Sequence, residues 1–303
     1  PPRRNHAPHR PRVRRAMIIT KHSTTPEALR ETASVTQSLF RVAAIQMASG
    51  PQVQANLQEA QRLIELAAAT GARIVALPEY FCLMGLRDAD KVKARERDGS
   101  GPVQDFLAAA ARRHRIWIVG GTLPLECDDE RKVRNACLVY DGEGKRVARY
   151  DKIHLFGFDN GRERYVESNT IEPGTEVVAF DSPFGRIGLS VCYDLRFPEL
   201  YRILALRGAD LLTVPSAFTT ATGRDHWEVL LRARAIENQA YVVVCNRVGE
   251  GGGLKYVGDS RIVDPLGELL ATGSQGETTL FADIEPATVA AVRDRFRFLP
   301  DRR

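Results

Sequence analysis

The sequence predicts an α/β fold, a sheet-rich layered sandwich with helices on the outside. From Phe40 onward, short apolar runs rich in β-branched residues alternate with amphipathic segments. Two hairpin patterns in the middle of the chain add antiparallel strands to this alternation. The 303 residues are 44% hydrophobic and 27% charged, which is enough to bury one large core.

The pattern begins with a strand in FRVAAIQM, residues 40–47. The segment from Val53 to Thr70 follows as a helix, because its apolar residues recur on one helical face: Leu57, Ala60, Leu63, Ile64 and Ala67. A second strand, Arg73 to Leu77, is ended by Pro78, which cannot donate to a ladder. A helix with Val103, Phe106, Leu107 and Ala110 on one face then leads to a strand at 116–121.

Hairpin turns are predicted at 141–144 and 181–185, so Lys152 and Cys192 each follow a strand that leaves a hairpin. The run GEGGG at 249–253 lacks the spacing of a dinucleotide-binding loop, and we expect a mobile loop there. The remaining predicted elements are a helix after Pro198, a strand at 209–215, a helix near 225–238, a strand at 241–246, a hairpin around 265–267 and a helix near 286–295.

The basic character of the chain belongs to its first residues. Residues 1–41 carry a formal charge of +7 within a total of +5, which leaves the remainder at −2. Such a segment can bind nucleic acid or act as a transit peptide, but we favour a disordered leader over 1–39, with Met17 as the natural start and no nucleic-acid partner. The predicted domain is 40–303. No signal-peptide core or membrane-length apolar run occurs, so we expect a cytoplasmic protein without membrane contact.

Four reactive side chains lie at strand ends or in adjacent loops, where active residues of α/β proteins gather: Glu79, Lys152, Glu167 and Cys192. Each alone has an ordinary explanation, such as a buried inert thiol or a solvated charge. Together they supply what a thiol nucleophile needs, a base for its proton and a cation for the developing oxyanion. The five cysteines form no C-x-x-C pair, so neither a disulfide framework nor a metal site is indicated.

The sequence around these four residues resembles the nitrilase (carbon–nitrogen hydrolase) superfamily, over about Phe40 to Pro300. The matching motifs are LPEY at Glu79, YDKIHLF at Lys152, YVES at Glu167 and GLSVCYDLRFPE at Cys192, in the order of that superfamily. The resemblance implies a four-layer α-β-β-α sandwich, assembly as a homodimer or higher homo-oligomer, and catalysis without metal or organic cofactor.

The resemblance also implies the roles of the residues. Glu79 is the general base, Cys192 the nucleophile, and Lys152 forms the oxyanion hole with the backbone N–H of Tyr193. Glu167 positions Lys152 and the substrate. The expected reaction is hydrolysis of a small linear carboxamide to an acid and ammonia, through a thioester on Cys192.

The segment 215–249 resembles the branch that holds deaminated glutathione amidases and ω-amidases, which hydrolyse amides of 2-oxo acids. PSAFT and HWEVLLRARAIE favour a deaminated-glutathione-amidase-like enzyme, whereas NQAYVVVCNRVG also fits an ω-amidase acting on 2-oxoglutaramate or 2-oxosuccinamate. In that branch the loop after the strand at 209–215 lines the pocket. Phe218, Thr219 and Thr222 are therefore expected to face the substrate.

Arg196, four residues after the nucleophile, is a candidate clamp for a substrate carboxylate, since a guanidinium can hold a carboxylate with two hydrogen bonds. An internal salt bridge to Glu199 or Asp194 is an equal alternative for this side chain. The substrate is accordingly expected to be a small amide that carries a carboxylate.

Three other functions compete with the amidase. A papain-like hydrolase would pair Cys192 with His154 or His226, but papain-like enzymes place the cysteine before the histidine, the reverse of Cys192 and His154. We expect His226 and Trp227 to be packing residues instead. A true nitrilase would use the same thiol, and a non-catalytic scaffold could use the same fold.

Overall fold

The structure, a computed structural model, describes residues 39–159, 161, 164–251, 253–273 and 275–303. The side chains at 164, 221, 222 and 224 are also outside the description. The leader predicted over residues 1–39 therefore lies outside the described residues except for Leu39, and its role and the domain boundary stay predictions. Within the described part of the chain, no helix has the length and apolar character needed to cross a membrane.

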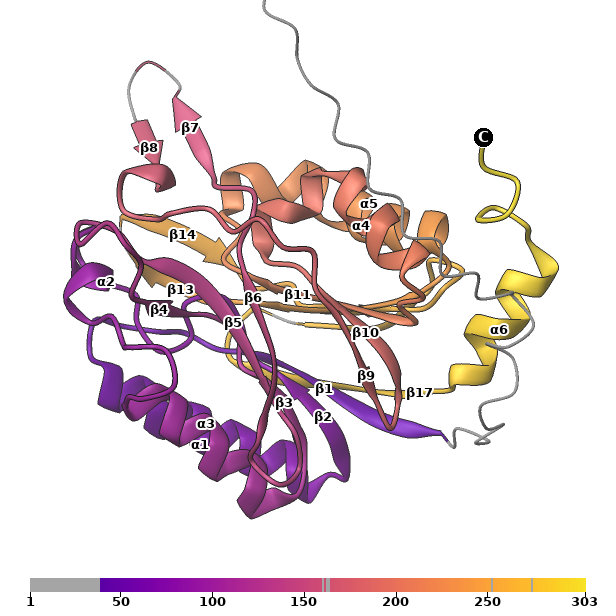
Figure 1. The fold of residues 1–303 in the computed structure, drawn as a ribbon, viewed down its shortest axis with the longest axis horizontal. Coiled ribbons are helices and arrows are strands. Elements are labelled where there is room, and N and C mark those ends of the chain that lie inside the picture. The colour runs from indigo at the N-terminus through magenta and orange to yellow at the C-terminus, as the bar shows by residue number, and fades with distance from the viewer. Residues whose placement is uncertain (1–38, 160, 162–163, 252, 274) are drawn as a thin grey trace, which may run out of the picture. The chain divides into compact units, whose positions relative to one another are not determined.

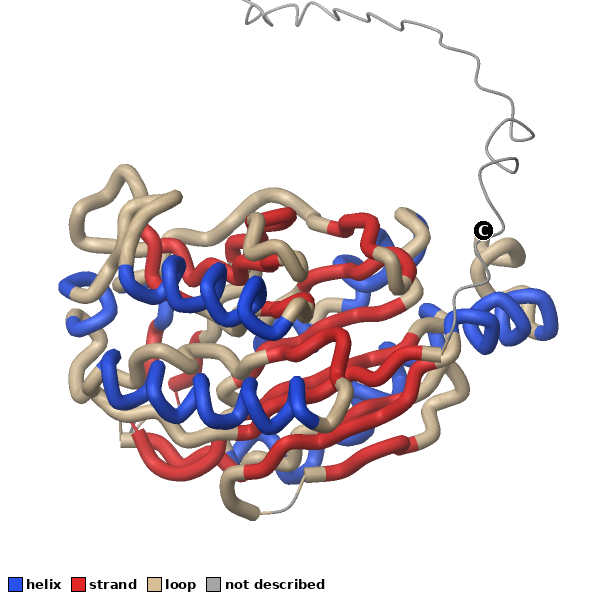
Figure 2. Tube along the Cα trace, turned by 90° about the horizontal axis from the view of Figure 1, so that it is seen from below, coloured by secondary structure: helices blue, strands red, loops and turns tan. Residues whose placement is uncertain are grey.

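Two mixed β-sheets pack face to face between two layers of helices (Figures 1 and 2). The first sheet has the order β17-β1-β2-β3-β5-β4, with β6 paired to β5. Its strands are β1 (Phe40–Gln46), β2 (Ala72–Ala76), β3 (Trp117–Val119), β4 (Leu123–Leu125), β5 (Arg134–Tyr140), β6 (Arg146–Asp151) and β17 (Thr278–Ile284). Helices α1 (Val53–Ala69) and α3 (Pro102–His114) cover its outer face (Figure 1).

The second sheet has the order β16-β15-β12-β11-β10-β9. Its strands are β9 (Ala179–Ser182), β10 (Gly185–Leu189), β11 (Leu211–Ser216), β12 (Tyr241–Asn246), β15 (Arg261–Val263) and β16 (Leu269–Thr272). Helices α4 (Pro198–Leu206) and α5 (Thr220–Asn238) cover its outer face, and α6 (Pro286–Arg295) follows β17 (Figure 1). The predicted four-layer α-β-β-α sandwich is confirmed.

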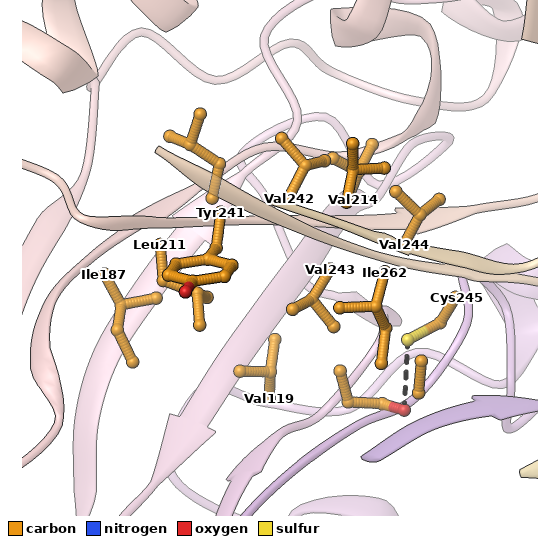
Figure 3. Close-up of a cluster of buried hydrophobic side chains, with 14 of the residues drawn as sticks. Val119, Ile187, Leu211, Val214, Tyr241, Val242, Val243, Val244, Cys245 and Ile262 are labelled. Atoms are coloured by element: carbon orange, nitrogen blue, oxygen red, sulfur yellow. Dashed lines mark hydrogen bonds between the residues drawn. The ribbon is translucent and has the colours of Figure 1, made fainter. Parts of the chain in front are cut away.

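The inner strands are apolar on both faces because each face is covered. In β12 every residue is buried: Val243 faces the first sheet, where Val119 lies, whereas Val242 and Val244 face the helical layer (Figure 3). The Cys245 thiol donates a hydrogen bond across the sandwich to the carbonyl of Ala76, 3.2 Å away (Figure 3). The two sheets thus share one continuous core.

Short elements complete the rim near the ends of the inner strands. They are α2 (Asp90–Lys93), the hairpin of β7 (Gly157–Asp159) and β8 (Arg164–Val166), the 3₁₀ turns η1 (Glu167–Asn169) and η2 (Cys192–Arg196), and the hairpin of β13 (Val248–Gly251) and β14 (Leu254–Val257).

Two predictions on local structure are wrong. The first three residues of the GEGGG run are not a loop, because Gly249 and Glu250 pair with Tyr256 and Lys255 in the β13–β14 hairpin. Ladder hydrogen bonds come from the backbone, so glycines that lack strand-forming side chains still pair. Helix α5 begins at Thr220 rather than near Asp225. Its first turn has no apolar period, so the sequence pattern did not predict that the helix begins there.

Candidate active site

Three reactive groups reach the site from the ends of three strands. Glu79 comes three residues after β2, Lys152 directly follows β6, and Cys192 lies three residues after β10. The first two strands belong to one sheet and the third to the other. All three side chains are buried, with 1%, 2% and 7% of their residues' surfaces exposed. Packing the two sheets together is therefore what assembles the group.

Lys152 lies between two carboxylates. Its Nζ is 2.9 Å from Oε1 of Glu79, and 3.0 and 2.9 Å from Oε1 and Oε2 of Glu167. Burial disfavours the charged ammonium, but the neighbouring Glu167 and Glu79 carboxylates outweigh it and raise the pKa of Lys152 well above its usual value. The side chain is therefore a fixed cation at neutral pH.

Glu79 accepts hydrogen bonds on both of its oxygens. Besides Lys152, Oε1 accepts from Nδ2 of Asn135 at 2.8 Å, and Oε2 accepts from the backbone N–H of Ala217 at 3.0 Å. Burial raises the pKa of this carboxyl above its usual value, although Lys152 opposes the shift. Glu79 is thus a stronger base than an exposed glutamate and is held in one orientation.

The Cys192 thiol and the Glu79 carboxylate line the same buried pocket and interact electrostatically. Burial, followed by the Glu79 carboxylate, raises the pKa of the thiol well above its usual value, and Lys152 only partly offsets this. The thiol is consequently protonated in the resting protein, and the Glu79 carboxylate in the same pocket can take its proton.

Glu167 has a second set of donors. The Tyr80 hydroxyl donates to Oε1 at 2.6 Å, and the backbone N–H of Phe156 donates to Oε2 at 2.6 Å. Burial opposes ionisation, but Lys152 and these donors together lower the pKa of Glu167. This carboxylate therefore stays charged and holds Lys152 from the side opposite Glu79.

Cys192 stands on a strained turn. Its φ is +47°, a left-handed conformation that non-glycine residues rarely adopt. It opens the 3₁₀ turn η2, so the N–H of Tyr193, the next residue, has no partner inside that turn. The turn thus offers a thiol and a neighbouring backbone donor at the same place.

Asp194 fixes this turn to the loop that carries Lys152. Its Oδ2 accepts from the N–H of Val191 at 2.8 Å and the hydroxyl of Tyr150 at 2.6 Å. Its Oδ1 accepts from the N–H of His154 at 3.0 Å and lies 2.7 Å from Nδ1 of that ring. Sequence reasoning missed this role, although the aspartate lies within the CYDLRFPE motif.

These groups line one pocket of about 470 Å³ of empty space, including its open mouth. Phe218 and Thr219, two of the residues expected to face substrate, lie in its wall, as do Tyr193 and Arg196. The side chain of Thr222 lies outside the described residues. Sequence reasoning missed the aromatic side of the wall, which is formed by Tyr80, Phe156, Tyr165 and Tyr256.

Arg196 does not form either of the internal salt bridges considered for it. Asp194 uses its oxygens on Val191, Tyr150 and His154, and among the described residues no carboxylate lies within ion-pair distance of Arg196. The guanidinium instead lies 5.3 Å from the ring centre of Phe218 and 3.2 Å, through Nη1, from Nδ1 of His226. Its charge is available to a ligand in the pocket.

The two histidines considered as partners of Cys192 are engaged elsewhere. His154 bonds to Asp194 and stacks on Phe197, with ring centres 3.7 Å apart. His226 is exposed and contacts Arg196, so the expectation that it is a packing residue is wrong. Trp227 does pack, because it is buried against Phe218 and donates to the carbonyl of Asp259 at 2.7 Å.

Comparison with known proteins identifies the family. The sequence profile of the carbon-nitrogen hydrolase family matches residues 41–294. The chain belongs to the carbon–nitrogen hydrolase family. This carbon–nitrogen hydrolase is 39% identical over 268 residues to a deaminated glutathione amidase of Synechocystis sp., covering 87% of the chain and 98% of that relative. It is 37% identical over 269 residues to an omega-amidase of Mus musculus, covering 88% and 96%.

Its structure is similar to that of the NitFhit protein of C. elegans, with a TM-score of 0.80 at 37% identity. The match covers 88% of this carbon–nitrogen hydrolase and 65% of the other chain, slightly less than two thirds of that protein's length. The family and the amidases among its relatives make this protein a hydrolase of amide carbon–nitrogen bonds.

Proposed function

We propose that this carbon–nitrogen hydrolase is a thiol amidohydrolase whose catalytic residues are Glu79, Lys152 and Cys192, with Glu167 as the positioning residue of Lys152. One observation carries the proposal: a buried ammonium, held by two carboxylates, shares one pocket with a buried thiol. This set provides a base, a nucleophile and a fixed positive charge within one pocket.

In the first half of the reaction, the thiol proton passes to Glu79 as the Cys192 sulfur attacks the carboxamide carbon. The raised thiol pKa favours this coupled transfer over a preformed thiolate. Negative charge develops on the carbonyl oxygen, where the Lys152 ammonium and the N–H of Tyr193 stabilise it. Glu79 then protonates the departing nitrogen, the C–N bond breaks, and a thioester remains on Cys192.

In the second half, water attacks the thioester carbon and gives its proton to Glu79. The C–S bond breaks, the acid leaves, and Glu79 returns the proton to the sulfur. No metal or organic cofactor takes part in these steps, and Glu79 carries every proton that moves.

We infer that the acyl half of the substrate carries a carboxylate held by Arg196. The guanidinium is in the pocket wall with no acidic partner among the described residues, and Phe218 and Thr219 lie in the same wall. Amides of 2-oxo acids fit this pocket. A deaminated-glutathione-type amide is our first candidate and 2-oxoglutaramate or 2-oxosuccinamate the second, because relatives with both names match most of the chain.

A substrate panel tests the proposal. Formation of the acid is measured with deaminated glutathione, 2-oxoglutaramate, a simple aliphatic amide and the matching nitrile. We expect turnover of at least one 2-oxo acid amide and less of the aliphatic amide. Turnover of the nitrile alone would make the protein a nitrilase, and the absence of turnover together with no thioester would support the non-catalytic scaffold.

Arg196 can be tested separately. Arg196→Ala should lower kcat/KM for a carboxylate-bearing amide by about 10- to 100-fold, as expected for losing a charge-assisted hydrogen bond. Arg196→Lys should recover only part of it, because an ammonium cannot make the paired contact. The aliphatic amide is the internal control, since it has no carboxylate. Equal losses with both substrates would contradict the clamp.

We further propose that the protein forms a homodimer or higher homo-oligomer in the cytoplasm. Apolar side chains are exposed on the helices that cover the second sheet, which lie side by side in Figure 1: Ile203 and Leu206 on α4, and Val229 and Ile236 on α5. Light scattering in solution tests the assembly, and a monomeric mass would contradict it. Cell fractionation tests the location.

A further inference from the structure

A second cavity adjoins the catalytic pocket, and we call it the outer chamber. It shares four wall residues with the catalytic pocket: Tyr80, Tyr165, Leu254 and Tyr256. The rest of its wall is the segment Leu83–Asp88 together with Lys91 of α2, and it has about 740 Å³ of empty space, including its opening to solvent. The two cavities are therefore adjacent and share a wall of three tyrosines and one leucine.

Lys91 is the less exposed of the two cations in the wall of the outer chamber. Its side chain is only 13% exposed, and Nζ lies 5.5 Å from the ring centre of Tyr80. Its nearest acid is Asp88, with Oδ1 3.6 Å from Nζ, and it makes no hydrogen bond within the described part of the chain. An ammonium has three donors, so Lys91 has hydrogen-bonding capacity left for an anionic ligand.

The wall of the outer chamber contains two other charged residues, Arg87 and Asp88. Arg87 is 76% exposed in its side chain and pairs with Asp90 at 3.9 Å. The remaining wall is mixed, because the apolar side chains of Leu83, Met84, Leu86 and Leu254 lie beside the three tyrosines. A ligand with polar groups along its body and one anionic end fits such a wall.

The two cations border different spaces. Arg196 and Phe218 line the catalytic pocket and not the outer chamber, whereas Lys91 lines the outer chamber and not the catalytic pocket. Tyr80 borders both, and its hydroxyl binds Glu167, the carboxylate that holds Lys152. Arg196 and Lys91 thus lie in the walls of two adjacent cavities, and Tyr80 is part of the wall that these cavities share.

We propose that the outer chamber binds the amine half of the substrate and that Lys91 pairs with a carboxylate on that amine. The substrate is then a secondary amide with an acidic acyl half and an acidic amine half, such as an acylated amino acid or short peptide. A primary amide, which releases only ammonia, leaves the outer chamber unused. This inference rests on the proposed function and specifies which amides it takes.

The reaction sequence limits where Lys91 can act. When the C–N bond breaks, the amine takes the proton from Glu79 and departs, while the acyl half stays on the Cys192 sulfur. Contacts with the amine half therefore affect only formation of the thioester. Hydrolysis of the thioester by water follows after the amine has left.

Two substrates that form the same thioester provide the test. In 2-oxoglutaramate the 2-oxoglutaryl group is joined to ammonia, and in deaminated glutathione it is joined to cysteinylglycine, which ends in a carboxylate. Lys91→Met should lower kcat/KM for deaminated glutathione by about 10-fold or more and leave 2-oxoglutaramate unchanged. Lys93→Met is the matched control, because Lys93 is on the same helix, pairs with Asp90 at 3.7 Å and is outside the outer chamber.

A second variant should have the opposite effect. Asp88→Asn removes the acid that competes for Lys91, so kcat/KM for deaminated glutathione should rise while 2-oxoglutaramate is unaffected. Deaminated glutathione in which the terminal carboxylate is amidated should be insensitive to both substitutions. These results together would establish that Lys91 binds the carboxylate of the amine half of the substrate.

Each other outcome overturns the inference. Equal losses with both substrates in Lys91→Met would place the acyl half in the outer chamber or give Lys91 a structural role. No loss with either would mean that the chamber is unused. A wild-type enzyme active only on 2-oxoglutaramate would overturn this inference and leave the proposed function intact, whereas inactivity on all amides would overturn both.

Discussion

Replacing Cys192 by Ala should abolish amide hydrolysis, with kcat/KM reduced by about 10⁴-fold or more. Alanine has no nucleophilic atom, so the variant cannot form the acyl intermediate. A water molecule in the space left by the sulfur is a much weaker nucleophile than a thiolate. Acid release in the steady state measures the loss. Mass spectrometry with a slow substrate should detect a thioester on the wild type and none on the variant.

The controls distinguish the nucleophile from a general need for thiols or histidines. Cys127→Ala removes a partly exposed thiol outside the pocket and should leave activity unchanged. His154→Ala and His226→Ala should keep measurable activity, because neither ring lines the catalytic pocket. Complete inactivity of a folded histidine variant would revive the cysteine–histidine pair that the sequence alone left open.

Lys152→Met should both inactivate and destabilise the protein. Without the ammonium, two buried carboxylates lose their common partner, and breaking a buried ion pair in this way costs about 3–5 kcal/mol of unfolding free energy. Loss of the oxyanion donor lowers kcat by about 10²- to 10³-fold in its own right. Denaturant unfolding and kcat, measured on the same preparation, check both effects.

The matched control is Lys145→Met, because Lys145 is exposed in the turn of the same β5–β6 hairpin. It should change neither stability nor rate. A folded Lys152→Met protein with wild-type stability and rate would contradict the assignment of Lys152. Reduced stability with a normal rate would limit it to a structural role.

Much of the sandwich could be predicted because its signals are local. Strand β1 and helix α1 have strong apolar periods, and the turn residues at 141–144 and 181–185 fix the two hairpins. The β13–β14 hairpin could not be predicted from its glycines, since its partner strand is defined by backbone pairing. The polar first turn of α5 likewise gave no local signal.

In the candidate site, too, some features have a local sequence signal and others depend on contacts between distant segments. The residues that could carry chemistry were identifiable by type and flanking motif, and the structure brings Glu79, Lys152, Glu167 and Cys192 together in one pocket. What each one contacts depends on tertiary packing. The Tyr80 hydroxyl on Glu167 joins residues 87 positions apart, and the Tyr150 hydroxyl on Asp194 joins residues 44 apart. No pattern within one segment encodes such contacts.

The three reactive groups come from two different sheets, so catalytic activity depends on the correct packing of the two sheets against each other. Glu79 and Lys152 extend from the first sheet and Cys192 from the second, so any slippage between the sheets separates the base from the thiol before either sheet frays. Inactivation by heat or denaturant should therefore track, or slightly precede, the loss of the sandwich. Fragments that contain only one sheet cannot retain partial catalysis.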